Sequence, residues 1–312
     1  MDGIHEDWNR IHTKPYIADR DCDGTQDATD AIAAWKNYLR RDKSPIVDIF
    51  QGQLRSELTC LRCKTHRSVR FEPFMYLSLP VTEQCTTIQD CLRVYLEEEQ
   101  LKGVNQWYCG KCKQHCDATK KTDLWILPPI LIVHLKRFSC NDYGQLASKN
   151  KRPIEFPLDD WNLGSFVPRI IPQEAHYDLY AVSNHIGSLG GGHYTAYTKS
   201  RFEDQWFDCN DAHVRPVEPQ VVRDAASAAY VLFYNRTASS STTTTTTAAS
   251  SSSSNVLLSR RPMIRRQSEN RPDLWPHQQL RDYARPPSSR RLLNNDNNGE
   301  QNEPSSSSSV TV

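Results

Sequence analysis

The sequence predicts an α+β fold in which helices and a finger-like insertion come first and a mostly antiparallel sheet follows. Three observations support this order. Residues 4–12 and 28–41 place apolar side chains at helical spacing. Two Cys-x-x-Cys pairs then bracket a long excursion of the chain, and beyond residue 125 extended segments alternate with turn residues. Helices that precede strands, instead of alternating with them, are typical of α+β folds.

The early elements follow from local patterns. The helix expected over 28–41 turns Trp35 and Leu39 to one face, and it should end before Ser44-Pro45. Because proline cannot continue the hydrogen bonding of a helix, the chain is expected to change direction there.

Extended segments are expected next, because apolar and polar residues alternate over 46–60 and over 68–81. A helix should then run over 87–101. Its start resembles a capping box, with Gln89 three residues after Thr86.

The C-terminal half of the globular part is expected to be strands, because apolar and aromatic runs are separated by turn residues. The longest run predicts a nearly continuous buried strand over 124–138. Further strands are expected over 154–159, 177–187, 193–200, 205–211 and 228–236.

The composition changes sharply near residue 236. Residues 1–236 mix aromatic, aliphatic and charged side chains as globular proteins do, whereas 237–312 is rich in Ser, Thr, Arg and Asn. Such a segment has too little apolar surface to offset the entropy lost on ordering. We therefore expect one globular unit over 1–236 and a disordered tail over 237–312.

The charges and the hydropathy exclude several classes of protein. Lys and Arg total 38 against 37 Asp and Glu, which gives no reason to expect a nucleic-acid partner. No apolar run is long enough to span a membrane, and residues 1–10 lack the apolar core of a signal peptide. An intracellular location, in the cytoplasm or the nucleus or both, is therefore expected. The ten cysteines should be reduced there.

Two Cys-x-x-Cys pairs, Cys60 with Cys63 and Cys109 with Cys112, predict a structural zinc site. Each pair can place two thiolates on a tight turn, and two such turns complete a tetrahedron. Cys116 and its neighbour His115 lie close by but are not needed as ligands. A site closed by four cysteines leaves no open position for catalysis. The alternative is that one pair is incidental, or that the site no longer holds a metal.

A candidate base follows three glycines, Gly190 to Gly192. His193 opens an expected strand, and the next strand should return antiparallel, so that Asn210 can lie beside the histidine. A histidine that is held by an amide or carboxylate is the usual base for a cysteine nucleophile. Taken alone, His193 could equally be a structural histidine of a sheet.

Several segments together resemble the ubiquitin-specific proteases, a family of papain-like deubiquitinases. They are the two Cys-x-x-Cys pairs and the runs ILIVHLKRF, SNHIGSLGGGHYTAY, QWFDCNDAHV and AYVLFYNR, with IHEDWNRIHTKPYIADRD near the start. The resemblance covers residues 1–236. It implies a hand-like fold with a partial thumb over 1–50, zinc-stapled fingers over 51–124 and a palm over 125–236.

The resemblance also implies an activity, namely hydrolysis of the isopeptide bond after the C-terminal glycine of ubiquitin. Ubiquitin and ubiquitinated proteins would then be the partners. By resemblance His193 is the general base, Asn210 orients it and Asp211 supports the pair. The loop from Asn184 to Gly192 resembles one that gates the ubiquitin tail.

The family's nucleophilic cysteine lies in a box resembling G-L-x-N-L-G-N-T-C, and none of the ten cysteines has that context. Cys85, just before an expected helix, is the best local substitute, but it belongs to the expected fingers. We therefore expect the chain alone to lack its nucleophile, either as the C-terminal part of a longer protease or as a short product without activity. The alternative functions are a catalytically inactive ubiquitin-binding scaffold and a zinc-stapled interaction module, and the second leaves GGGHYTAY unexplained.

Overall fold

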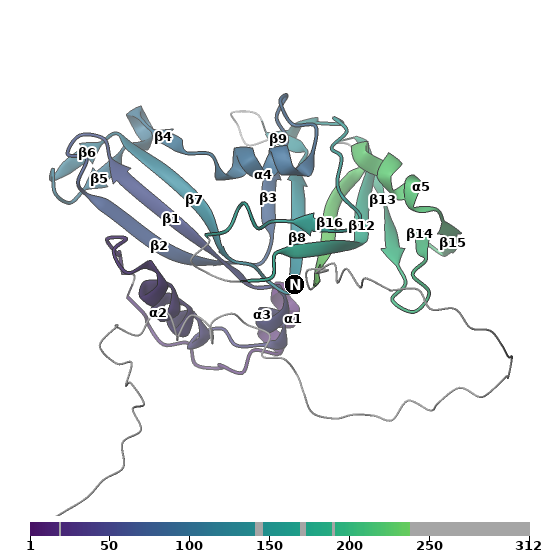
Figure 1. Cartoon of the computed structure of the whole chain (residues 1–312), viewed down its shortest axis with the longest axis horizontal. Helices are drawn as coiled ribbons and strands as arrows, with labels where there is room; N and C mark the ends of the chain where they lie inside the picture. The colour runs from purple at the N-terminus through teal and green to yellow at the C-terminus, as the bar shows by residue number, and fades with distance from the viewer. Residues whose placement is uncertain (19, 141–145, 169–172, 189–190, 238–312) are drawn as a thin grey trace, which may run out of the picture.

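The structure is a computed structural model, and it describes residues 1–237 apart from residues 19, 141–145, 169–172 and 189–190. A smaller and a larger β-sheet form two lobes, and helices pack against them (Figure 1). All but one of the strand pairings in these two sheets are antiparallel. The expected α+β class is therefore confirmed. Residues 238–312, nearly the whole expected tail, lie outside the described residues.

The smaller sheet has the strand order β2-β1-β7-β4. Its central strand β1 pairs antiparallel with β2 on one side and with β7 on the other. A two-stranded hairpin of β5 and β6 lies at the far end of this lobe (Figure 1). The strands are β1 (Gly52–Cys60), β2 (Arg67–Phe74), β4 (Glu99–Leu101), β5 (Trp107–Cys109), β6 (Gln114–Cys116) and β7 (Ala118–Ile126).

The larger sheet has the order β15-β14-β13-β12-β16-β8-β3, and β11 pairs with the first two residues of β12. The β3–β8 pair is parallel. The strands are β3 (Leu77–Pro80), β8 (Ile130–Lys136), β11 (Trp161–Asn162), β12 (His176–Ser188), β13 (Gly191–Lys199), β14 (Trp206–Asn210), β15 (His213–Val217) and β16 (Ala229–Thr237). A separate pair consists of β9 (Phe138–Cys140) and β10 (Leu146–Lys149).

Helices cover both sheets. In the smaller lobe, buried Ala31 and Ile32 pack with Phe71 and Trp125. The main core lies around α4 and the larger sheet, where Leu92 and Tyr234 are fully buried. None of the described helices is long and apolar enough to cross a bilayer. The helices are α1 (Asp2–Asp7), α2 (Asp27–Leu39), α3 (Pro45–Phe50), α4 (Ile88–Leu96), α5 (Pro219–Asp224) and the short 3₁₀ turns η1 (Gly103–Asn105) and η2 (Ala225–Ser227).

A buried guanidinium ties the end of β8 to the start of β16. Arg137 is only 1% exposed, and it donates hydrogen bonds to backbone carbonyls at Asn150, Arg152, Ala226 and Ala229. Burial lowers the pKa of Arg137 below its usual value. The hydrogen bonds satisfy donors that would otherwise be costly to bury.

Two expectations near the N-terminus were wrong. The helix expected over 4–12 ends at Asp7, and part of the strand expected over 46–60 is the helix α3. The Ser44 hydroxyl accepts the backbone N–H of Val47, and Pro45 occupies the first turn. Serine followed by proline therefore starts a helix here, a role that both residues favour.

The long strand expected over 124–138 was also wrong, because residues 127–129 separate β7 from β8 and place them in different sheets. Two consecutive prolines in that link explain the break, since neither can donate to a sheet. Residues 154–159 form only an isolated bridge, at Glu155, and β15 was not expected.

The capping box of α4 is displaced by one residue from its expected position. The Thr87 hydroxyl accepts the backbone N–H of Asp90, and the Asp90 carboxylate accepts the backbone N–H of Thr87. The hydrogen bond from the Thr87 hydroxyl is the largest of the causes that lower the pKa of Asp90 to about 2. The reciprocal bonds satisfy N–H groups that have no partner inside the helix.

Replacing Thr87 tests this cap. We expect Thr87→Ala to lower the free energy of unfolding by about 1 kcal/mol near pH 7, whereas Thr87→Ser should retain most of it. The stabilisation from charged Asp90 is present above about pH 4, where unfolded aspartate titrates, and is lost as the pH falls toward 2. Urea unfolding at neutral and acidic pH measures both effects. Equal stability of the Ala and Ser variants would argue against the cap.

Candidate functional site

His193 and Asn210 lie side by side on neighbouring strands of the larger sheet. β13 pairs with β14 in a register that sets Ala196 opposite Cys209. Side chains of a strand alternate between the two faces, so His193 and Asn210 project from the same face. The His193 Nε2 atom is 2.7 Å from the Asn210 Oδ1 atom. The neighbours expected from the sequence are therefore brought into hydrogen-bond contact.

This contact determines where the histidine can carry out proton transfer. An amide oxygen only accepts, so Nε2 donates to Asn210 and carries the hydrogen of the neutral ring. The lone pair of the neutral imidazole then lies on Nδ1. The His193 side chain is 47% exposed, so the ring can be approached from solvent. Such a ring can accept a proton at Nδ1.

Asp211 adds negative charge near the same nitrogen. It follows Asn210 in the turn between β14 and β15 and has a left-handed φ of 50°. One carboxylate oxygen lies 3.7 Å from His193 Nε2, beyond normal hydrogen-bond length, and the Asp211 side chain is 77% exposed. At that distance Asp211 makes no direct hydrogen bond to the ring, and water screens its charge.

The hairpin of β12 and β13 carries His193 near its turn end. Ile186 pairs with His193, and the register continues to Ser188 opposite Gly191. Asn184 is therefore a buried residue of β12 and not part of a loop, and its amide donates to the Thr195 hydroxyl at 3.4 Å. Gly190 of the expected gating loop lies outside the described residues.

His185 lies directly beneath the glycines and was not singled out from the sequence. Its ring is buried, and it packs against Phe138 and Tyr194 with ring centroids 5.3 and 4.8 Å away. A Cβ atom at Gly192 would overlap the His185 Nε2 atom, whereas one at Gly191 would meet nothing within 4 Å. Only glycine therefore fits at residue 192.

A lysine from the neighbouring strand pair holds the same hairpin. Lys149, at the end of β10, donates to the carbonyl oxygens of His185 at 2.6 Å and of Gly187 at 3.4 Å. Gly187 has a φ of 118°, a conformation that favours glycine. The repeated glycines were a visible signal in the sequence, but nothing there pointed to Lys149 or His185 as their supports.

The described thiol groups have partners elsewhere in the molecule. Cys209 is on the face of β14 opposite to Asn210, with its sulfur 3.7 Å from the Thr198 hydroxyl. Cys85 is fully buried beside Thr82, at 3.1 Å. Within the described residues, the polar partners of His193 are Asn210 and Asp211. The side chain of Cys140 is not among those that the structure describes.

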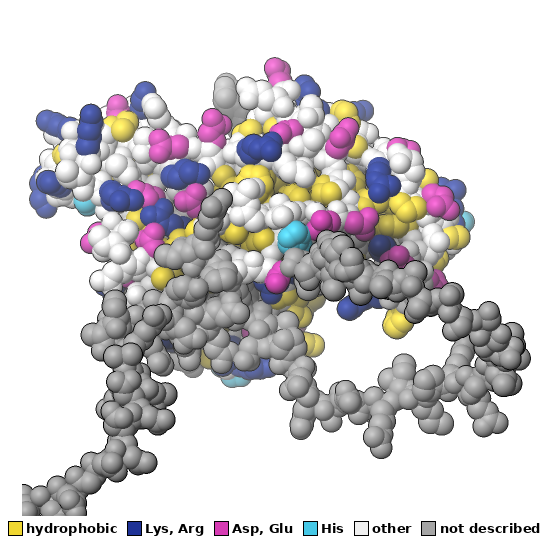
Figure 2. All heavy atoms as spheres, in the orientation of Figure 1, with side chains coloured by type: hydrophobic (Ala, Val, Ile, Leu, Met, Phe, Trp, Pro, Cys, Tyr) yellow, Lys and Arg dark blue, Asp and Glu magenta, His cyan; other side chains and the backbone are white. Residues whose placement is uncertain are grey.

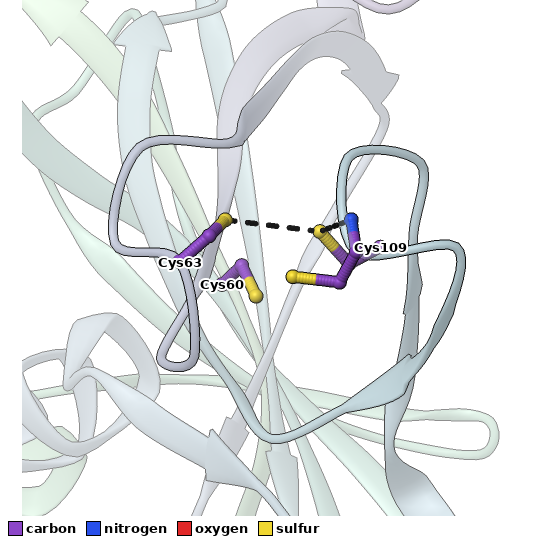
Figure 3. Close-up of side chains that lie close together, drawn as sticks. Cys60, Cys63 and Cys109 are labelled. Carbon is purple, nitrogen blue, oxygen red and sulfur yellow. Dashed lines mark hydrogen bonds between the residues drawn. The ribbon is translucent and has the colours of Figure 1, made fainter.

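The four cysteines expected to bind zinc come together at the far end of the smaller lobe. Their sulfur atoms all lie within 4.8 Å of one another. Figure 3 shows the sulfurs of Cys60, Cys63 and Cys109 facing one another between two loops. The two turns match: Lys64 and Lys113, the residues after each pair, have left-handed φ values of 54° and 56°.

The donor set fits a tetrahedral zinc ion. With sulfurs about 2.3 Å from zinc, neighbouring sulfurs of a tetrahedron are about 3.8 Å apart, and Cys63 and Cys109 are separated by 3.9 Å. A backbone N–H at Thr65 is the largest cause that lowers the pKa of Cys63 to about 6, which favours the thiolate that binds metal. Cys116 is buried in the same cluster as a fifth thiol.

Basic side chains surround this cluster. Figure 2 shows Lys and Arg gathered at the end of the smaller lobe that carries β5 and β6. Their charge offsets the negative charge that four thiolates bring to the site. The exposed basic residues of the two turns are Arg62, Lys64, Lys111 and Lys113.

A second group of possible metal ligands is already paired with a lysine side chain of the protein. His5, Glu6 and Asp42 are close enough to share a metal ion. The Lys14 ammonium, however, lies 2.7 Å from Glu6 and 3.0 Å from Asp42. This group therefore joins α1 to the segment before α3 as an ion-pair network.

Comparison with known proteins agrees with this arrangement. A family model described as ubiquitin carboxyl-terminal hydrolase matches residues 1–234. Over 237 residues, 75% of the chain, it is 40% identical to ubiquitin carboxyl-terminal hydrolase 2 of Gallus gallus and 38% identical to that of Homo sapiens. The chain spans 65% of the length of the first relative and 38% of the second.

Solved structures show the same fold. One is described as the yeast SAGA DUBm with a point mutant of Sgf73, and it matches with a TM-score of 0.55 and 30% identity over 62% of this chain and 42% of that one. Another is the SAGA Ubp8/Sgf11/Sus1/Sgf73 DUB module bound to ubiquitin aldehyde. It matches with a TM-score of 0.53 and 27% identity over 65% of this chain and 46% of that one.

Substitutions at the two glycines test the packing beneath the hairpin. We expect Gly192→Ala to lower the free energy of unfolding by about 1–3 kcal/mol, because its methyl group would overlap the buried His185 ring. Gly191→Ala is the matched control and should change it by no more than about 0.5 kcal/mol. Urea unfolding measures both values, and similar losses in the two variants would contradict the proposed contact.

Metal analysis tests the cysteine cluster. Purified protein should contain about one zinc ion per chain, because four thiolates complete a structural site. The double variant Cys60→Ser/Cys112→Ser removes one ligand from each turn and should lose the metal and melt at a lower temperature. Unchanged metal content and melting temperature in that variant would rule out the site.

Proposed function

This chain belongs to the ubiquitin carboxyl-terminal hydrolase family, and on that premise we propose that it serves in thiol-dependent removal of ubiquitin from proteins. The bond cleaved is the isopeptide bond after the C-terminal glycine of ubiquitin. The observation that carries this proposal is the 2.7 Å contact from His193 Nε2 to Asn210 Oδ1, which leaves Nδ1 available as a base.

His193 has two tasks in the proposed reaction. Its Nδ1 atom first takes the proton of a cysteine thiol, and the resulting thiolate attacks the carbonyl carbon of the isopeptide bond. The protonated ring then gives that proton to the leaving lysine amine, and an acyl-enzyme remains. In the second half of the reaction His193 takes a proton from water, which attacks the thioester and releases ubiquitin.

Asn210 and Asp211 act through the ring. Asn210 fixes its tautomer and orientation, so that Nδ1 faces outward in every turnover. Asp211 places a carboxylate 3.7 Å from Nε2 of this ring, and its exposure to water screens that charge. We assign the described part of the β12–β13 hairpin, with Gly191 and Gly192, to the loop that gates the ubiquitin tail.

The nucleophile is proposed to come from outside the nine described thiols. Cys209 faces away from His193, and Cys85 and Cys91 are fully buried. Cys22 bridges to Val69 in the smaller lobe, and the other five belong to the cysteine cluster. The His193 side chain is 47% exposed, so a thiol from another segment or another chain can approach its ring. The chain by itself is therefore expected to be inactive.

The remaining parts of the proposal concern metal, partner and location. A zinc ion on Cys60, Cys63, Cys109 and Cys112 would hold the two turns together as a structural element. Ubiquitin is the proposed partner, supported by the related module that was solved with ubiquitin aldehyde. The nine cysteines whose side chains are described are all free thiols, which supports the proposed reducing location in the cytoplasm or nucleus.

A second candidate has specific support. If no thiol reaches His193, the same surface would bind ubiquitin without cleaving it, and the chain would act as a scaffold. The placement of the described thiols favours this candidate for the isolated chain. The two candidates differ in a single measurable property, namely covalent capture of ubiquitin.

A ubiquitin probe that traps catalytic thiols separates the candidates. We expect the chain alone to remain unlabelled, and we expect labelling and turnover once it is joined to a segment bearing the family's cysteine box. In the joined protein, His193→Ala should abolish turnover, because neither proton transfer would have a partner. Asn210→Ala should cost less, since it removes orientation but no proton-transfer group.

Two outcomes would overturn parts of this proposal. Labelling of the chain alone that stops with His193→Ala would show that one of its own cysteines is the nucleophile. A joined protein that binds ubiquitin, is never labelled and does not turn over would favour the scaffold.

A further inference from the structure

His66 bridges the two cysteine turns, and neither the expected zinc ligands nor the proposed reaction includes it. It lies three residues after Cys63, and its backbone carbonyl accepts the N–H of Cys60 at 3.1 Å. Its ring reaches the other turn, where Nδ1 lies 3.2 Å from the Cys109 sulfur. One residue thus contacts one turn by its backbone and the other by its side chain.

The ring is held in place by two neighbours. It stacks on Trp107 of β5, with ring centroids 4.9 Å apart and planes at 21°. Gly110 is also close, because a Cβ atom there would be 3.4 Å from the Cε1 atom of His66. A stacked ring with close neighbours has few alternative rotamers, so the nitrogen is preorganised toward the sulfur.

The chemistry of the contact follows from the state of the sulfur. A metal-bound cysteine is a thiolate and can only accept, so Nδ1 of His66 must donate. Four thiolates around one zinc ion leave a net negative charge, and a hydrogen bond to sulfur disperses part of it. Cys109 also receives the backbone N–H of Cys112 at 3.4 Å, so two donors converge on this thiolate.

We propose that His66 is a positioning residue of the zinc centre. Its hydrogen bond to Cys109 links the second turn to the first and slows the loss of the metal. The proposal rests on the zinc assignment made above. By donating to the sulfur, His66 makes that thiolate a poorer base and nucleophile. Protons, oxidants and competing chelators then remove it from the metal more slowly.

His115 provides a matched control in the opposite turn. It is also a histidine near the cysteines, and its ring packs edge-on against Tyr108 at 5.6 Å. Its Nδ1 atom, however, lies 3.3 Å from the backbone carbonyl of Gln106 and not at a sulfur. Replacing His115 removes a ring of the same size without touching the bond in question.

Zinc release to an excess of chelator, measured with the full chain, tests the proposal. His66→Phe keeps the stacking on Trp107 but loses the donor, and it should release zinc about ten-fold faster or more. His66→Asn keeps a donor without the aromatic ring, and it should be slower than the Phe variant. His115→Phe should release zinc at the wild-type rate.

A spectroscopic readout keeps the test decisive if His66→Phe does not fold. In cobalt-loaded protein, loss of a hydrogen bond to a thiolate shifts the sulfur-to-cobalt charge-transfer band to longer wavelength. We expect this shift in His66→Ala and not in His115→Ala. A wild-type band position in His66→Ala would overturn the hydrogen bond.

The outcomes also separate this proposal from the zinc assignment. If wild-type protein contains one zinc per chain and His66→Phe releases it at the wild-type rate, the role of His66 is overturned while the zinc site stands. Equal acceleration in His115→Phe would overturn it as well, because the effect would then be general loosening. Wild-type protein without zinc would overturn both.

Discussion

Strand β12 is the element on which the rest of the larger lobe depends. Its thirteen residues pair with β13 along one edge and with β16 along the other. The first pairing sets His193 opposite Ile186, and the second anchors the strand in the core through Val182 and Leu232. A shift of β13 by one residue against β12 would turn His193 to the opposite face of the sheet.

The two functional regions use different physical means to hold their geometry. Around His193, a hydrogen-bonded sheet positions the residues. The buried His185 ring packs against the hairpin, and half-buried Lys149 donates a hydrogen bond to its backbone. At the cysteine cluster there is little secondary structure, since β5 and β6 have three residues each. The cysteine sulfurs, together with the two turns and the His66 ring, replace a hydrophobic core there. This is common where a chain segment is too small to bury enough apolar surface.

Residues that belong to short local motifs could be predicted from the sequence, whereas residues that act through contacts distant in the sequence could not. Two Cys-x-x-Cys pairs and a glycine-flanked histidine carry short-range signals, and the structure brings together the residues they marked. The supports of His193 had no such signal, because Lys149 reaches His185 across 36 residues through a backbone carbonyl. Likewise α3 was expected as a strand, since its apolar run is short enough to fit either class and only the Ser44 cap decides.

Strand β16 comes last in the described chain but lies inside the larger sheet, between β12 and β8. Until residues 229–237 have left the ribosome, β8 and β12 each present an unpaired edge. The sheet therefore cannot close until this strand has emerged, however early the other strands do. Such late, non-local closure makes folding slow and exposes edges to pairing with other chains, so a nascent chain of this kind has particular need of protection by chaperones.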